Sequence, residues 1–553
     1  MGLCALLAFD AAVLHVAARD AVAPYYPSSL DQVQYLTESY AGFDLLRARG
    51  VVAGTIEILT QPRAQGMLAE FVSAYVFLLT GPARLPALDL NIAWSVAYLG
   101  LTAILVRRAL GLAPAIAATG LMLAPRSTPG LLGGVFDFRL DLQGMCMWGI
   151  LLAFVLLELP RMRARRGSGP AVTLCVVLVS VALCLTRFIA TTYLVLWLIA
   201  ILSLSCITDL GLRAQHLVIV RRTLLTSLGA VVFAAGGFAL LNWPLIREYY
   251  IGGHVFSDEK AFRALEVGVT SLASSLIFYP FSAARDQAGP PFIAVSGVLL
   301  GVAAWAAFAR RQGARDLVDR IRPLLPTWTL VTLLLSVIAP YVVLTSDEAK
   351  STVVANAFLP PAVLGVTWLF AAGLAATRRC ALTVWRLGVG AGAAALTLGF
   401  GAQWLTLQTT VYDQQRRGEA AAASQFMLDV GDYVRSVDGG HATWASDAHV
   451  DFAPNLVTRV YYYEQRHVWL DLPSRLGDGP LTQTLSEDQV LHQAGGSDIL
   501  LLTVGYDTGY PYDESISQAK SALFELARQR YSLLDQFRIH GTDVFAFVRS
   551  KSA

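Results

Sequence analysis

Long apolar stretches separated by short polar connections dominate the first 400 residues of the chain. A helix needs about 20 predominantly apolar residues to cross the hydrocarbon core of a bilayer. Stretches of about this length, a few of them shorter, recur about eleven times. The pattern predicts a polytopic α-helical membrane protein, with transmembrane helices near residues 2–22, 88–106, 111–125, 142–159, 170–186, 189–207, 223–241, 291–309, 326–345, 356–377 and 383–400.

The composition agrees with this pattern. Hydrophobic residues make up 55% of the chain, charged residues make up 15%, and the mean hydropathy is +0.54, well above the average of soluble domains. A net charge of +2 gives no indication of nucleic-acid binding. The six cysteines lie in or beside apolar segments without metal-ligand spacing, so we expect small core residues.

Arginines cluster after every second predicted helix. The positive-inside rule places such connections in the cytoplasm, so we expect a cytoplasmic N-terminus and an external C-terminal region. For a multi-pass protein of the bacterial inner membrane, that region lies in the periplasm. The basic connections contain Arg107 and Arg108, the segment 161–166, Arg213, Arg221 and Arg222, the segment 310–322, and Arg378, Arg379 and Arg386.

One apolar segment does not fit the alternation. GMLAEFVSAYVFLLTG (66–81) is about sixteen residues long and contains Glu70. Counting it as a transmembrane helix would place all later arginine clusters outside the cell. We therefore expect it to lie in or near the outer membrane interface.

The polar connections on the other side of the membrane, at 23–87, 126–141 and 242–290, carry acidic and aromatic residues. The second one continues into GVFDFRLDLQG (134–144), where two aspartates and an arginine fall within five positions. Since these connections share one side of the membrane, we expect them to form a polar chamber at the outer face.

The region 401–553 has a different pattern from the membrane part, residues 1–400. Helix patterns at 416–437 and 514–531 alternate with apolar strand patterns at 441–446, 498–504 and 543–550. We therefore expect a small external α/β domain.

Carboxylates and guanidinium groups in such a chamber suit the transfer of a sugar from a lipid phosphate. A carboxylate can act as general base on the acceptor. Guanidinium groups, or a divalent metal ion, can stabilise the developing charge of the phosphate leaving group.

Two short segments resemble the GT-C glycosyltransferases, which include the protein O-mannosyltransferases and the lipid A aminoarabinose transferase. YPSSLDQVQY follows the first predicted helix, as the acid-bearing start of the first external loop does in that family. TQPRAQGMLAEFVSAYVFLLTG lies where those enzymes have a His-Pro-Pro-like sequence before an external helix. This chain has Asp31-Gln32 where relatives often have a paired Asp-Glu, and Gln61-Pro62-Arg63 in place of His-Pro-Pro.

The resemblance implies a polyprenyl-phosphate-linked sugar as donor and a glycolipid, a polysaccharide or a protein as acceptor. It implies Asp31 as the general base, with Asp137 or Asp141 orienting donor or acceptor. Whether a divalent metal ion takes part is left open. The phosphate-binding candidates are Arg63 and Arg139, then Lys260 and Arg263, and the third connection adds the substrate-binding candidates Tyr249, Tyr250, His254 and Glu259.

Each candidate also has a structural interpretation. Asp31 is in a position to cap the helix that follows it. Asp137 and Asp141 fit a solvated turn between two transmembrane helices. The two tyrosines fit an interfacial aromatic belt, and His254 fits an ordinary loop histidine.

Two other function classes compete with a glycosyltransferase. A transporter or flippase of lipid-linked saccharides should carry ionisable residues in mid-membrane and broken helices in paired halves, whereas most acids here fall in connections. A non-catalytic scaffold would explain the external domain but not the charged residues of the first two external connections.

Overall fold

The computed structural model divides the chain into two compact units. The first comprises Met1–His15, Ile56–Phe71 and Asp89–Thr410, and the second comprises Val16–Thr55, Val72–Leu88 and Val411–Ala553. The structure describes residues 2–27, 29–164, 169–256, 259–308, 326–376, 381–437, 441–447, 454–477, 482–505 and 510–550.

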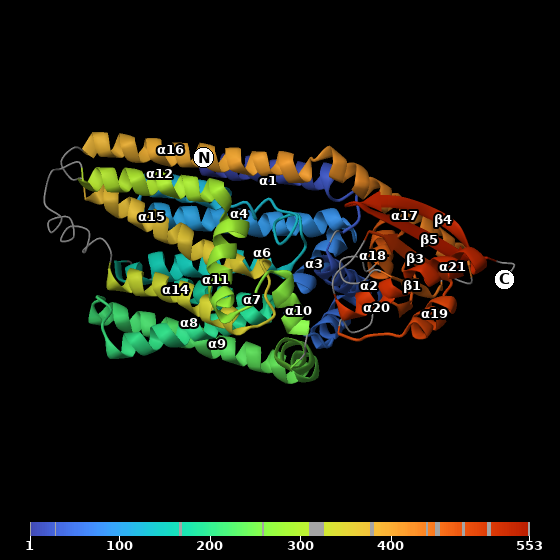
Figure 1. The fold of residues 1–553 in the computed structure, drawn as a ribbon. Coiled ribbons are helices and arrows are strands. Elements are labelled where there is room, and N and C mark those ends of the chain that lie inside the picture. The colour runs from blue at the N-terminus through green and yellow to red at the C-terminus, as the bar shows by residue number, and fades with distance from the viewer. Residues whose placement is uncertain are drawn as a thin grey trace. The chain divides into compact units, whose positions relative to one another are not determined.

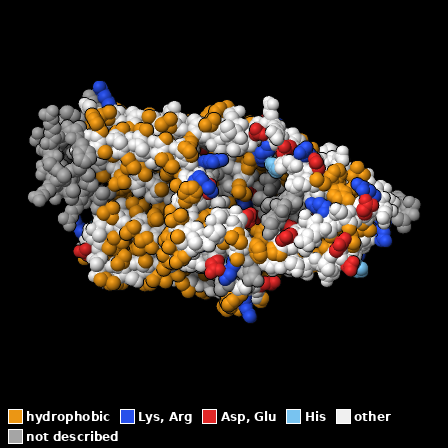
Figure 2. Space-filling view, viewed as in Figure 1, with side chains coloured by type: hydrophobic (Ala, Val, Ile, Leu, Met, Phe, Trp, Pro, Cys, Tyr) orange, Lys and Arg blue, Asp and Glu red, His pale blue; other side chains and the backbone are white. Residues whose placement is uncertain are grey.

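The membrane part is helical. Over the described residues, ten helices are long and apolar enough to cross a membrane. Figure 1 shows them running side by side, and Figure 2 shows hydrophobic side chains gathered over them. The helices of this part are α1 (Gly2–Ala21), α2 (Leu30–Thr60), α3 (Leu68–Thr80), α4 (Arg84–Leu110), α5 (Leu112–Leu123), α6 (Leu140–Ala153), η1 (Phe154–Glu158), η2 (Leu159–Ala164), α7 (Gly169–Thr186), α8 (Phe188–Ile207), α9 (Ala214–Ile246), η3 (Arg247–Phe256), α10 (Glu259–Glu266), α11 (Leu272–Ser282), η4 (Ala283–Ala288), α12 (Gly289–Phe308), α14 (Thr327–Ser346), η6 (Val353–Phe358), α15 (Leu359–Ala375), α16 (Ala381–Thr406) and η7 (Leu407–Val411).

The predicted transmembrane helix at 111–125 is shorter than expected. It forms α5, which has 12 residues, and at about 1.5 Å per residue it is too short for a hydrocarbon core of about 30 Å. The chain between α5 and α6 is irregular, and its stretch from Gly133 to Phe138 is buried. Irregular backbone at membrane depth is tolerated where protein covers it.

Contacts between the end of α4 and the residues that follow α6 show how the chain runs between these helices. Helix α5 and the buried segment together lead the chain back to the opposite end of the helical part, where α6 begins. Arg108, near the end of α4, has its Nε 3.3 Å from Glu158 Oε1, beyond the end of α6. Arg161 also donates to the carbonyl of Arg108. The two chain segments that carry Arg108 and Arg161 therefore lie together. The alternation of basic connections predicted that these two connections share one side. The basic positions at 165–166, 310–322, 378 and 379 lie outside the described residues.

The third polar connection is mostly helical instead of a loop. Residues 242–290 include the end of α9, η3, α10, α11 and η4. The apolar residues of α11 make Leu272–Ala307 a single apolar candidate span. The apolar segment at 66–81 forms α3, which has 13 residues.

Small residues let α5 and α16 pack closely. A Cβ at Gly399 would lie 2.4 Å from the carbonyl oxygen of Gly120, and a Cβ at Gly120 would lie 2.4 Å from the carbonyl carbon of Ala395. About two turns earlier on both helices, a Cβ at Gly392 would lie 3.0 Å from the carbonyl oxygen of Ala113. Stripes of small residues allow such backbone contact between membrane helices.

The second unit contains a five-stranded mixed sheet with the strand order β2-β1-β3-β5-β4. The parallel pairs are β1–β2 and β1–β3, and the antiparallel pairs are β3–β5 and β4–β5. Figure 1 shows helices around these strands. The elements are α17 (Gln414–Ser436), β1 (Trp444–Ser446), α18 (Pro454–Arg466), β2 (Ser474–Leu476), α19 (Glu487–Gly495), β3 (Ile499–Val504), α20 (Pro511–Gln518), α21 (Lys520–Arg530), β4 (Tyr531–Ile539) and β5 (Thr542–Arg549).

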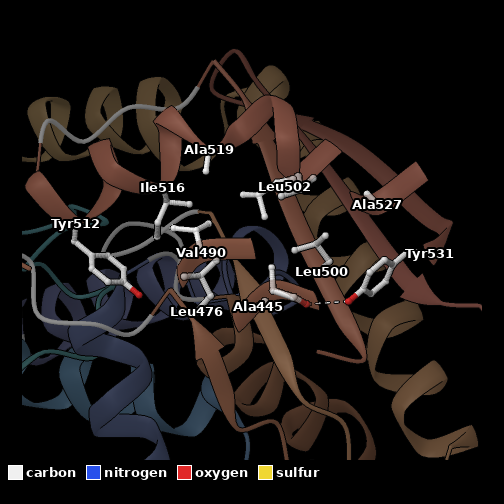
Figure 3. Packing of buried hydrophobic residues seen from close by; sticks show 12 residues of the cluster. Ala445, Leu476, Val490, Leu500, Leu502, Tyr512, Ile516, Ala519, Ala527 and Tyr531 are labelled. Atoms are coloured by element: carbon white, nitrogen blue, oxygen red, sulfur yellow. Dashed lines mark hydrogen bonds between the residues drawn. The ribbon is translucent and has the colours of Figure 1, made fainter. Parts of the chain in front are cut away.

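The core of the sheet lies between β3 and the three helices α19, α20 and α21. Leu500 and Leu502 of β3 are fully buried and pack in one cluster with Val490 and Ile516 (Figure 3). Tyr531, at the start of β4, belongs to the same cluster, and its hydroxyl donates to the carbonyl of Ala494 at 2.9 Å. The predicted α/β domain is thus confirmed.

A buried ion pair joins the three chain segments of the second unit. The guanidinium of Arg84 lies 3.7 Å from Glu464 Oε2, and both side chains are almost fully buried. Tyr40 donates to the other oxygen of this carboxylate at 2.8 Å, and Arg84 also donates to the carbonyl of Ala23. The pair therefore connects α2, the start of α4 and α18.

We expect Gly399→Ala to lower the unfolding temperature, because the new methyl group meets the Gly120 carbonyl and overpacking costs about 1–3 kcal/mol. Gly401→Ala on the same helix is the matched control, since a Cβ there meets nothing within 4 Å. The measurement is thermal unfolding of the purified protein in detergent. Equal unfolding temperatures for the two variants would contradict the close contact.

We expect Glu464→Gln to destabilise the protein by about 3–5 kcal/mol, because it leaves Arg84 buried without a counter-charge. The control is Arg466→Gln on the same helix, whose exposed side chain lies 3.8 Å from Asp432. Chemical denaturation of both variants measures the difference. A loss no larger in Glu464→Gln than in the control would show that the buried pair does not hold the unit together.

Candidate functional site

Polar side chains from several connections gather at one end of the first unit. Asp141 lies in the first turn of α6, whereas Glu158 and Arg161 follow at the opposite end of that helix. Contacts at the Asp141 end bring the starts of α6 and α8 together, and they also link η3 to the connection between α14 and α15.

Hydrogen bonds fold the buried segment before α6 around Asp137. Gly133, with a φ of 71° that suits glycine, donates its N–H to Asp137 Oδ2 at 2.7 Å. Asn91 of α4 donates to the carbonyl of Asp137 at 2.8 Å, and Gln143 donates to Asn91 at 3.1 Å. Asp137 is 0% exposed and Asp141 is 5% exposed. The interpretation of this segment as a solvated turn is therefore wrong.

Two arginines face the two buried carboxylates. The Nε of Arg139 lies 3.8 Å from Asp137 Oδ2 and 3.7 Å from Asp141 Oδ2. Arg187, just before α8, pairs with the other oxygen of Asp141. We call these four residues the outer ion cluster, after the side of the membrane on which the arginine distribution predicts them to lie. Two positive and two negative charges compensate one another in a largely buried place, where isolated charges are costly.

Burial, reinforced by the positive charge of Arg187, lowers the pKa of Arg139 to about 10, and Tyr249 acts in the opposite direction. Arg139 therefore stays positively charged at neutral pH.

A narrow cavity lies beside the outer ion cluster. Its lining includes Asp141, Arg187, Tyr193 and Asn356 among apolar residues. The side-chain nitrogen of Asn356 is buried without a hydrogen-bond partner in the described part of the chain. The cavity thus offers a cation and an amide donor, which are groups that bind phosphate oxygens.

Sequence reasoning missed Arg187 and Asn356. Arg187 stands alone in LCLTRFIATT, between two apolar helices and on the side opposite the arginine clusters. A single cation on that side was the signal available in the sequence. Asn356 carries no comparable signal, because an amide near the start of a transmembrane helix is not unusual.

The third connection places its aromatic residues next to the outer ion cluster. Tyr250 donates to Gln65 at 2.9 Å, and its ring packs on Phe188, the residue after Arg187. His254 Nδ1 lies 2.9 Å from Asp347 Oδ2. The rings of Tyr249 and Tyr250 both contact the imidazole of His254. His254 is therefore part of an ordered cluster.

The basic candidates of α10 lie at the same end. Lys260 pairs with Glu348 at 2.8 Å, and Arg263 lies in the last turn of the helix. The side chain of Glu259 lies outside the described residues.

Lys350, which sequence reasoning missed, holds the connection after α14. Its ammonium group donates to the carbonyls of Leu344, Thr345 and Asp347. Burial lowers the pKa of Lys350, while Asp347 and Glu348 counteract this effect.

Arg63 has structural partners. Its guanidinium pairs with Glu70 at 2.5 Å in a buried place. The backbone N–H of Arg63 donates to the side-chain oxygen of Asn242 at 2.7 Å. Close by in the chain, a Cβ at Gly66 would lie 2.3 Å from the carbonyl oxygen of Leu185. The segment 61–67 therefore packs directly on the end of α7, next to Arg187.

Asp31 belongs to the second unit and lies in the first turn of α2. Ser29 caps this helix, since its hydroxyl accepts the N–H of Gln32 at 3.2 Å. The interpretation of Asp31 as the cap is therefore wrong. Further along α2, Asp44 accepts hydrogen bonds from Tyr463 and Trp469 of the C-terminal region, which anchors the helix that carries Asp31.

The described residues contain no group of three or more His, Cys, Asp or Glu side chains suited to hold a metal ion. The carboxylates of the outer ion cluster face arginines instead of one another. We therefore derive no step through a metal.

Three solved structures, one of ArnT and two of archaeal oligosaccharyltransferases, share this fold over nearly the whole of this chain. ArnT from Cupriavidus metallidurans bound to undecaprenyl phosphate gives a TM-score of 0.58 at 12% identity, covering 99% of this chain and 98% of that chain. The oligosaccharyltransferase of Archaeoglobus fulgidus in complex with Zn and sulfate gives a TM-score of 0.54 at 12% identity. The match covers 99% of this chain and 73% of that chain. The archaeal oligosaccharyltransferase AglB from Archaeoglobus fulgidus, in complex with an inhibitory peptide and a dolichol-phosphate, gives a TM-score of 0.53 at 11% identity. The match covers 100% of this chain and 74% of that chain.

No family model and no curated protein sequence matches the chain. At these low identities the similarity shows a common fold. The predicted fold, a polytopic helical membrane part with a C-terminal mixed α/β sheet, is confirmed, and it is similar to the fold of ArnT.

Proposed function

We propose that this protein is a membrane-embedded glycosyltransferase that moves a sugar from a polyprenyl-phosphate donor to an acceptor at the outer face of the bacterial inner membrane. The single observation that carries the proposal is the outer ion cluster: two arginines held in a buried place at one end of a GT-C fold. The acceptor is a glycolipid, a polysaccharide or a protein.

The reaction makes the need for these arginines clear. An acceptor oxygen or nitrogen attacks the anomeric carbon of the donor sugar, while the bond from this carbon to the phosphate oxygen breaks. The electron pair of that bond goes to the phosphate, and the acceptor proton goes to a carboxylate. Arg139 and Arg187 stabilise the charge that develops on the phosphate, as guanidinium groups do elsewhere.

The donor phosphate competes with Asp141 for Arg187. In the structure, the carboxylate of Asp141 occupies the place beside Arg187 that a phosphate oxygen would take. Asp137 and Asp141 then orient the arginines and the bound substrate. Lys260, Arg263, Tyr249, Tyr250, His254 and Glu259 are secondary candidates for binding the rest of the donor or the acceptor.

Asp31 is the general base in this proposal. The role rests on the resemblance of YPSSLDQVQY to the first external loop of GT-C enzymes and on the place of Asp31 in the first turn of α2. A helix N-terminus favours the ionised carboxylate that a base requires. For Arg63, its buried pair with Glu70 favours a positioning role over direct phosphate binding.

The similar solved structures support a lipid-phosphate donor, since ArnT was solved with undecaprenyl phosphate and AglB with a dolichol-phosphate and a peptide. The arginine distribution supports a cytoplasmic N-terminus and a periplasmic C-terminal region.

Asp10 in α1 is the kind of intramembrane acid that is expected of a transporter. Its side chain is buried and accepts a hydrogen bond from Gln403 at 2.9 Å.

We expect Asp31→Asn to reduce sugar transfer by about 10²–10⁴-fold, the usual contribution of a general base. Glu38→Gln on the same helix, whose carboxylate accepts from Gln34, is the matched control and should stay active. The assay follows sugar transfer by the purified protein in nanodiscs. Separately, mass spectrometry of envelope lipids from cells with and without the gene identifies the product. Full activity of folded Asp31→Asn would exclude Asp31 as the base, and a transporter or scaffold would also keep its function.

We expect Arg187→Gln to reduce kcat by about 10²–10³-fold, because removing one donor to a developing anion typically has this effect. Arg187→Lys should restore part of the activity, since it keeps the charge but loses the forked geometry. Arg247→Gln, which removes an exposed arginine at the same end, is the control. Unchanged kcat in Arg187→Gln would refute a role of the outer ion cluster in phosphate binding.

A further inference from the structure

A second and larger cavity lies near the outer ion cluster. Its volume is about 350 Å³, within the range of about 300–1,000 Å³ typical of small-molecule sites. The cavity belongs entirely to the first unit. It is lined by residues 126, 127 and 130–132, by Asp286 and Gln287 of η4, by Thr352 and Val353, by Thr406 at the end of α16 and by Thr410 of η7.

The two cavities are lined by neighbouring segments of the chain. The segment that leads from Arg126 to Asp137 lines the larger cavity at its start and forms the outer ion cluster at its end. The connection after α14 contributes Thr352 to the larger cavity and Asn356 to the narrow one. The segments touch where a Cβ at Gly133 would lie 2.3 Å from Val353. The two cavities are thus neighbours.

Hydrogen bonds order the lining of the larger cavity. Ser127 donates its N–H to the carbonyl of Gln287 at 3.2 Å, and Arg126 does the same to Ala288 at 3.1 Å. The side chain of Gln287, which is buried, donates to the carbonyl of Thr352 at 2.9 Å. The backbone around the cavity therefore needs little reorganisation when a ligand binds.

The lining combines four hydroxyl-bearing residues with the apolar side chains of Leu131, Leu132 and Val353, and its charges balance. Ser127, Thr352, Thr406 and Thr410 contribute hydroxyls, Gln287 an amide, and Arg126 and Asp286 one charge of each sign. The hydroxyls of Thr406 and Thr410 donate to their own helix, and a hydroxyl that donates can still accept a hydrogen bond. Such a lining matches a ligand that presents many hydroxyl groups and no net charge.

We propose that this cavity is a saccharide site, distinct from the outer ion cluster, that binds a neutral sugar unit of a substrate. Its role as the acceptor site rests on the proposed transfer reaction, which needs an acceptor next to the phosphate of the donor. Its ability to bind a sugar does not. The cavity offers a phosphate one arginine, Arg126, beside the carboxylate of Asp286, whereas the outer ion cluster supplies two arginines.

Saturation-transfer NMR on the full-length protein in nanodiscs tests the proposal without any lipid donor. The probes are glucose, mannose and N-acetylglucosamine, each titrated with the wild-type protein. We expect at least one of them to bind, and Arg126→Gln or the double variant Thr406→Val and Thr410→Val to weaken binding roughly tenfold, as expected for lost hydrogen bonds.

Thr397→Val is the matched control. It removes an exposed hydroxyl that donates to its own helix α16 but lies outside the cavity. The control should bind as the wild type does, and thermal unfolding checks that each variant is folded. Arg126 is exposed, so its replacement keeps the test usable if the double variant unfolds.

Three results would overturn the proposal: no binding of any probe by the wild type, equal binding by the folded cavity variants, or displacement of the sugar by equimolar inorganic phosphate. Asp31→Asn should bind the sugar normally. Loss of transfer without loss of sugar binding, or the reverse, therefore separates a failure of this inference from a failure of the proposed function.

Discussion

The pairing of Arg187 with Asp141 is the interaction on which the arrangement of the outer end depends. It joins the start of α6 to the turn between α7 and α8, and Arg139 adds the carboxylate of Asp137 to the same group. Removing one partner of a buried pair leaves an uncompensated charge that costs about 3–5 kcal/mol. The four residues therefore hold together as a set.

The close packing of α5 on α16 is a second condition for this arrangement. Because α5 is too short to cross the membrane, an irregular segment must complete the path to α6. This segment is tolerated because protein covers it and because its polar groups are paired, as the bonds from Gly133 and Asn91 to Asp137 show. The same segment lines the larger cavity and supplies Asp137 and Arg139 to the outer ion cluster, so the short helix and these candidate sites are consequences of one feature of the fold.

The second unit has a comparable arrangement around the pair of Arg84 and Glu464. Here a buried cation from the start of α4 meets a carboxylate of α18, with the hydroxyl of Tyr40 on the same carboxylate. The result is that α2, which carries Asp31, is anchored by residues more than 400 positions later in the chain.

The sequence by itself determined the features that depend on local pattern. Apolar length placed ten of the transmembrane helices, and alternating patterns located α17, β3 and β5. Asp137, Arg139 and Asp141 were found because three charges within five positions are conspicuous between apolar helices. Strand β4 was missed because YSLLDQFRI, at the edge of the sheet, mixes polar and apolar positions. Only the tertiary structure decided which distant residues meet: the pairing of Arg187 with Asp141, that of Arg84 with Glu464, and the walls of the hydroxyl-lined cavity. Such contacts depend on how helices pack, and packing follows from shape and small residues along whole helices, which periodicity does not reveal.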